Sequence, residues 1–170
     1  MRDVATRCMQ SALLLVLCSG AAAGAVPEVA YWDNWTDASG VSHLTRCRLQ
    51  TFSLHSVSKP ATPEWQDRQP EPARSILTNV EPPGWVGGWH ENPAVQWIIP
   101  VQGVWSVQAM DGTRATLAPG DLMIGEDQGS RPDAAGRTGH LSRNAGPAPV
   151  ALMIVQLDAL PRTDRPCRFR

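Results

Sequence analysis

Short runs of apolar or alternating residues, separated by proline and glycine, limit most strongly how this chain can fold. The runs have the length of β-strands, and 15 prolines and 14 glycines interrupt the 170 residues. A repeat of about 3.6 residues, which an amphipathic helix requires, hardly occurs. The sequence therefore predicts an all-β protein in which helices are few and short.

Eight segments are predicted to be strands: residues 48–57, 75–80, 85–90, 95–101, 104–110, 113–117, 121–126 and 150–157. Asp111 and Gly112 predict a tight hairpin, because both residue types tolerate a positive φ angle. The prolines between Ser58 and Pro72 exclude an interior strand there, so we expect a surface loop.

The N-terminus has the features of a secretory signal peptide. Arg2 and Arg7 precede an apolar run over residues 11–18, and the small residues at 23–25 form a cleavage pattern. The apolar run is shorter than the roughly 20 residues that a membrane span needs. We therefore expect residues 1–25 to be removed, a mature chain beginning at Val26, and a periplasmic or secreted protein.

The charge balance argues against two classes of partner. Without residues 1–25 the chain has 13 basic and 15 acidic residues, a net charge of −2. The sequence has no basic patch that would indicate binding to nucleic acid, and no second long apolar run that would indicate a membrane protein. The remaining 145 residues fit one domain.

Two cysteines, Cys47 and Cys167, remain in the mature chain. Disulfides persist in exported proteins, so we expect a bridge between these two residues, with two buried free thiols as the alternative. No Cys-x-x-Cys motif or Cys/His cluster indicates redox catalysis or a structural zinc site.

The most informative segment is GWVGGWHENPAVQWIIPVQG, residues 84–103. His90 and Asn92 are two residues apart on a predicted strand, so they share a face, and the Asn92-Pro93 turn brings Gln96 back beside them. These polar groups need a partner, a ligand or a metal in such apolar surroundings. Seven tryptophans accompany two phenylalanines. This indicates either a bulky core or stacking surfaces for a ligand at Trp85, Trp89, Trp97 and Trp105.

In this segment the chain resembles the cupin superfamily. The first cupin motif places a Gly, two His, a Glu and a closing Gly at the spacing of Gly84, His90, Asn92, Gln96 and Gly103. Asn92 and Gln96 replace the second His and the Glu. The resemblance implies a jelly-roll β-barrel over residues 76–157, followed by a C-terminal tail (158–170). Residues 26–75 are predicted to form an N-terminal arm, the first strands and the proline-rich loop, and we expect the arm to dock on the barrel because Trp32 and Trp35 favour burial.

The second cupin motif resembles residues 119–144. Pro119, Gly120 and Asp121 match its first turn, and His140 with Asn144 matches its His-x-x-x-Asn ending, after an inserted loop. Strand alternation puts Glu126 on one face with Leu122 and Ile124, from which it could replace the missing carboxylate. The loop residues that follow, Asp127, Arg131, Asp133 and Arg137, are predicted to be solvated, with a lid over the barrel as the alternative.

The resemblance implies a small-molecule site inside the barrel. We expect His90, Glu126 and His140 to be catalytic and Asn92 and Gln96 to orient the ligand. The family's usual cofactor is one divalent iron, manganese or zinc ion, here held by His90, Asn92, Gln96 and His140, and metal-free chemistry is the alternative. An isomerase, cyclase or dioxygenase fits this site. A non-catalytic, exported binding module is the other hypothesis, and a homodimer is compatible with both.

Overall fold

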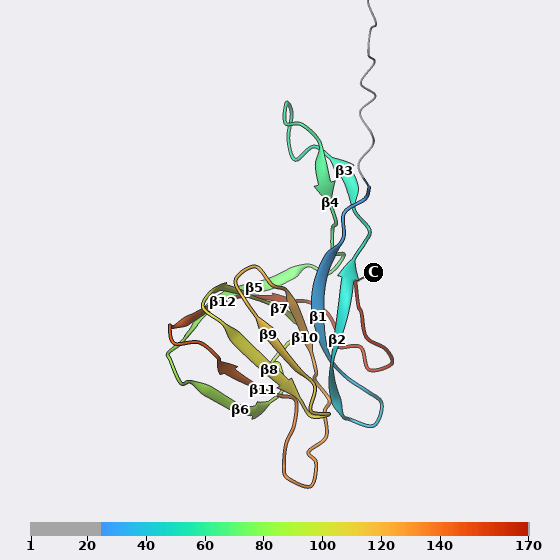
Figure 1. Ribbon diagram of the computed structural model, residues 1–170. Coiled ribbons are helices and arrows are strands. Elements are labelled where there is room, and N and C mark those ends of the chain that lie inside the picture. The colour runs from blue at the N-terminus through green and yellow to red at the C-terminus, as the bar shows by residue number, and fades with distance from the viewer. Residues whose placement is uncertain (1–24, 170) are drawn as a thin grey trace, which may run out of the picture.

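The computed structural model describes residues 25–169, which form twelve β-strands and no helix (Figure 1). The prediction of an all-β protein is confirmed. The strands form two large sheets and a small hairpin, and the described strands do not close into one hydrogen-bonded barrel. The expected closed barrel is therefore replaced by two facing sheets with free edges.

The larger sheet has six strands. Their order is β2 (Ser42–Leu49), β1 (Val29–Thr36), β10 (Met123–Glu126), β7 (Gln96–Gln102), β12 (Val150–Leu157) and β5 (Ala73–Glu81). The smaller sheet has the order β6 (Val86–His90), β11 (His140–Asn144), β8 (Trp105–Ala109) and β9 (Arg114–Leu117). β5 and β6 end their sheets next to each other in the chain, and they are not paired.

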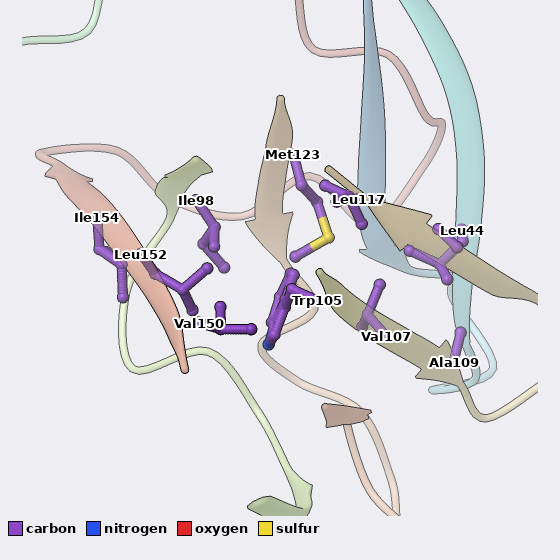
Figure 2. Close-up of a cluster of buried hydrophobic side chains, with 11 residues drawn as sticks. Leu44, Ile98, Trp105, Val107, Ala109, Leu117, Met123, Val150, Leu152 and Ile154 are labelled. Carbon is purple, nitrogen blue, oxygen red and sulfur yellow. The ribbon is translucent and has the colours of Figure 1, made fainter. Parts of the chain in front are cut away.

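The hydrophobic core lies between these two sheets (Figure 2). Trp105 and Val107 from the smaller sheet pack with Ile98, Met123 and Leu152 from the larger one. Four of these residues alternate with less buried residues along their strands, which is the pattern of a strand with one face in the core. The fifth, Met123, lies on β10, whose residues are all buried. The alternation in the sequence thus determines which side chains face the space between the sheets.

The N-terminal segment is a full member of the larger sheet. β1 pairs in parallel with β10 and antiparallel with β2. The sequence predicted only a docked arm here. A strand explains the buried Tyr31 and Asn34 better, because an arm on the surface would leave one side of them in solvent.

The strand predictions are mostly confirmed. The predicted single strand 48–57 is wrong, because this segment is divided between β2 and a short outer strand, β3 (Ser53–His55). The predicted surface loop contains one short strand, β4 (Glu64–Gln66), which is mostly exposed. β3 and β4 pair into a hairpin that projects from the two sheets (Figure 1). β11 was not predicted either, because the polar residues of His140–Asn144 hide its alternation.

The predicted hairpin at Asp111-Gly112 joins β8 to β9. Gly112 has a φ angle of 89°, whereas Asp111 is not in the positive-φ region. Backbone bonds from Gly112 N to Ala109 O and from Ala109 N to Thr113 O make this a three-residue loop. The turn position was correct, and the expected pair of positive φ angles was wrong.

The C-terminal segment covers the outer face of the larger sheet. Cys167 forms a disulfide with Cys47 of β2, which confirms that prediction. Tyr31 Oη donates a hydrogen bond of 2.7 Å to Phe169 O, and the Phe169 ring stacks on Trp97 at 5.2 Å. Within the described residues no helix is long and apolar enough to cross a membrane. The predicted signal peptide lies outside the described residues, apart from Ala25.

Reducing this disulfide should destabilise the fold, because the bridge joins residues 120 positions apart and restricts the unfolded chain. We expect the free energy of unfolding in urea to fall by about 2 to 5 kcal/mol when reductant is added. A chain with both Cys47→Ala and Cys167→Ala is the control and should ignore the reductant. Equal stability of the oxidised and reduced wild type would contradict the prediction.

Candidate functional site

A cavity of about 540 Å³ lies between the two sheets on the side of the unpaired strands β5 and β6. This volume is in the range of small-molecule sites. Its polar wall contains four residues of the two motifs, which were expected to converge: His90, Asn92, Gln96 and His140. Its apolar wall is formed by core residues that include Ile98, Leu152 and Ile154.

The two histidines face each other across paired strands. His90 of β6 is opposite His140 of β11, and their ring centroids are 4.5 Å apart. His140 is buried, with 2% of its surface exposed, whereas His90 is exposed. His90 Nδ1 contacts the carbonyl of Gly88 at 3.0 Å. The pair therefore joins a buried imidazole to an imidazole that solvent reaches.

Asp127 orients the ring of His140 through a contact with its Nδ1 atom. Its Oδ2 is 2.7 Å from His140 Nδ1, and it also accepts a hydrogen bond from Asn34 Nδ2. Its Oδ1 accepts bonds from the backbone N–H and the side-chain amide of Asn92. Burial opposes ionisation of Asp127, but the charge and hydrogen bond of His140 and the Asn92 donors lower its pKa below the usual value.

These contacts fix the proton of the His140 ring. Both oxygens of Asp127 already accept N–H groups from Asn92 and Asn34, and an ionised carboxylate can only accept. Nδ1 of His140 must therefore carry the proton that it donates to Asp127. Nε2 is the ring nitrogen left to exchange a proton with a molecule in the cavity.

A chain of side-chain hydrogen bonds leads to the same carboxylate. Ser75 donates to Gln156, Gln156 donates to Gln96, and Gln96 donates to Asn92, at 2.7, 3.2 and 2.8 Å. Asn92 Nδ2 then donates to Asp127. Because every link points its donor toward Asp127, the negative charge of that residue determines how each amide is oriented.

Gly125 makes room for this network. It precedes Glu126 on β10, and a Cβ atom at this position would lie 2.5–2.6 Å from the side chain of Asn92. No carbon atom can occupy that space while Asn92 stays against Asp127. The glycine is thus required by close packing and not by its φ angle.

Glu126 does not join the cavity, contrary to the prediction. Its Oε2 accepts hydrogen bonds from Arg168 Nε and Nη2 and from the backbone of Arg162. The predicted alternation with Ile124 is correct, but this face of β10 is covered by the C-terminal segment. Burial and the nearby Glu126 raise the pKa of Asp33 on the same face to about 7, although the backbone N–H groups of Cys167 and Arg168 oppose the rise.

Asp127 is the residue of the candidate site whose place the sequence analysis missed. It was predicted to belong to a solvated loop, yet none of its surface is exposed. The remainder of that loop does lie at the surface, where Arg137 pairs with Asp133 and covers the Trp89 ring. Alternation along β10 was the available signal, since it puts residues 125 and 127 on the face opposite Glu126.

Some of the tryptophans line the cavity and others lie outside it. Trp105 lines the cavity, as predicted. Trp89 lies under Arg137, and Trp97 packs with Tyr31 and Phe169 on the outer face, so neither of these rings lines the cavity. Trp85 also lines the cavity. Its ring runs beneath Gly87, where a Cβ atom would be 2.5 Å from it.

Glu81 is a second acidic residue that the sequence did not single out. It ends β5, lines the cavity and has 6% of its surface exposed. Burial raises the pKa of its carboxyl to about 7, an effect that the nearby indole N–H of Trp105 partly offsets. Neither Glu81 Oε2 nor Trp105 Nε1 completes a hydrogen bond.

The donor set does not fit the expected metal ion. His90 and His140 are two nitrogen ligands, but Glu126 points away, and the oxygens of Asn92 and Gln96 already accept hydrogen bonds. Among the described residues no group of three or more His, Cys, Asp or Glu side chains is placed to hold a metal. A bound metal usually has at least three protein ligands.

Comparison with protein-family models gives no match for this chain, and comparison with curated protein sequences gives none either. The resemblance to cupins therefore rests on the motif residues alone.

Substitution of Gly125 by alanine should disrupt the site, because the new Cβ must displace the Asn92 amide from Asp127. Leaving a buried charge with fewer donors should cost about 2 kcal/mol of unfolding free energy. Gly146→Ala is the control, since its Cβ would meet only ordinary contacts at 3.6 Å and beyond. Equal urea midpoints for the two variants would show that Asn92 has room to move.

Proposed function

We propose that this protein is a cupin-like jelly roll that binds a small organic molecule between its sheets and transfers protons on that molecule through His140. The observation that carries the proposal is the fully buried Asp127, whose Oδ2 lies 2.7 Å from Nδ1 of His140, a residue that lines the cavity. Two facing sheets and the spacing of the motif residues support the jelly roll. The Cys47–Cys167 disulfide is compatible with the expected export.

The proposed chemistry is general acid–base catalysis. His140 Nε2 takes a proton from the ligand, and Asp127 stabilises the imidazolium that forms. The adjacent His90 connects this ring to solvent, because it is exposed and its ring lies 4.5 Å from that of His140. Asn92 and Gln96 each use one amide N–H in this network, and with the second N–H they can orient a carbonyl or hydroxyl oxygen of the ligand.

Among the reaction classes that the sequence suggested, isomerisation and cyclisation need only such proton transfers. A dioxygenase needs a metal, and the donor set described above supplies two imidazoles without a third ligand. We therefore assign no step of the proposed reaction to a metal ion.

A non-catalytic binding module is the second candidate, and the amide chain favours it. Ser75, Gln156, Gln96 and Asn92 satisfy one another, so the wall is rigid before any ligand arrives. A preformed wall suits a receptor as well as an enzyme.

Deuterium exchange separates the two candidates. The protein is incubated in D₂O with neutral enolisable ketones, namely acetylacetone, cyclohexanone and phenylacetone, and exchange of their α-protons is followed by NMR. Wild type should accelerate exchange of at least one ketone. His140→Gln should lower that rate by about 10² to 10⁴-fold, because its amide can still donate to Asp127 but cannot accept a proton.

His55→Ala, on the exposed strand β3, is the control and should match wild type. Equal exchange rates for His140→Gln and wild type would contradict the catalytic role of His140. Binding of the ketones without any exchange would instead favour the binding module.

A further inference from the structure

We propose that the end of the cavity at Glu81, Trp85 and Trp105 binds a positively charged group, so that the ligand is an organic amine with an apolar body. This inference rests on the proposed function, because it concerns the same cavity. It assigns cation binding to the end of the cavity at Glu81, whereas the proposed proton transfer takes place at the end with His90 and His140.

Strand register aims Glu81 into the cavity. Glu81 is opposite Val150 on the neighbouring strand β12, and paired residues share a face of the sheet. Val150 belongs to the core between the sheets (Figure 2). Glu81 therefore projects its carboxylate toward the same interior, and only 6% of the residue's surface is exposed.

Glu81 differs from the other buried carboxylates among the described residues. Glu126 is paired with Arg168, Asp127 with His140, and Asp33 with the backbone N–H of Cys167. Glu81 Oε2 has no hydrogen-bond partner. Oδ1 of Asp33 and Oε1 of Glu126 also lack one, but both of these residues accept hydrogen bonds on their other oxygen and neither lines the cavity. No Lys or Arg lines the cavity, and its other titratable side chains are His90 and His140. A buried carboxylate without a donor is costly, and an incoming ammonium group would remove that cost.

The neighbours of Glu81 suit a cation with an apolar body. The Trp85 and Trp105 rings line the cavity with Glu81, and aromatic rings attract organic cations. Leu77, Ile98 and Leu152 form the apolar wall. The amides of Asn92 and Gln96 also line the cavity and suit an oxygen atom on the same ligand.

Three probes of matched shape test the charge preference. Binding of 2-phenylethylamine, 2-phenylethanol and phenylacetate is measured by isothermal titration calorimetry at about pH 6 and about pH 8, on either side of the pKa of Glu81, about 7. At the higher pH the amine should bind about tenfold or more tightly than the alcohol, and phenylacetate most weakly. Going to the lower pH should weaken amine binding by about tenfold, because Glu81 then takes up a proton.

Glu81→Gln should remove the preference for the amine, so that the ratio of amine to alcohol affinity falls to about one. Its fold is checked by thermal unfolding, and Glu81→Asp, which keeps the charge, should retain a preference for the amine. Glu64→Gln, an exposed acid on β4 in the projecting hairpin, is the matched control and should behave as wild type (Figure 1).

Two results would overturn the inference and leave the proposed function standing: equal binding of amine and alcohol by wild type, or a preference for the amine that persists in Glu81→Gln. Failure of all three probes to bind would count against the inference and against a small-molecule cavity together.

Discussion

A buried negative charge at Asp127 organises this site. A carboxylate without access to water must be surrounded by donors, and the fold supplies them from three directions: Asn34 on β1, Asn92 after β6 and His140 on β11. These residues belong to both large sheets. The same charge therefore connects the sheets, orients the amides that line the cavity and determines which nitrogen of His140 faces a ligand.

The two faces of β10 place neighbouring acidic residues in different networks. Asp127 follows β10 and turns toward Asn92 and His140, whereas Glu126 turns outward to Arg168 and the disulfide-linked C-terminal segment. Asp127 accepts hydrogen bonds on both oxygens, and Glu126 accepts them on Oε2. Glu81 lines the cavity with an oxygen that has no partner, and we propose that the charge of a ligand matters there.

Local patterns in the sequence predicted what depends on alternation and turns. The strand 150–157, the hairpin at Gly112 and the approach of Asn92 and Gln96 to His90 follow from such patterns, whereas the place of His140 was expected from the resemblance to the second cupin motif. The face of β10 that is covered by the C-terminal segment depends on a contact between distant parts of the chain, so Glu126 was placed on the wrong side. Asp127 and Glu81 were missed because an acidic residue is normally exposed, and only the tertiary structure buries them.

The protonation of the His140 ring tests the central claim most directly. In protein labelled with ¹⁵N, two-dimensional NMR that correlates ring nitrogens with ring carbon-bound protons distinguishes the two neutral forms of a histidine. The account predicts that the neutral His140 ring carries its proton on Nδ1, which donates it to Asp127. A neutral ring with its proton on Nε2 would contradict the account, because Nδ1, which lies 2.7 Å from Asp127 Oδ2, could then donate no hydrogen bond to this carboxylate.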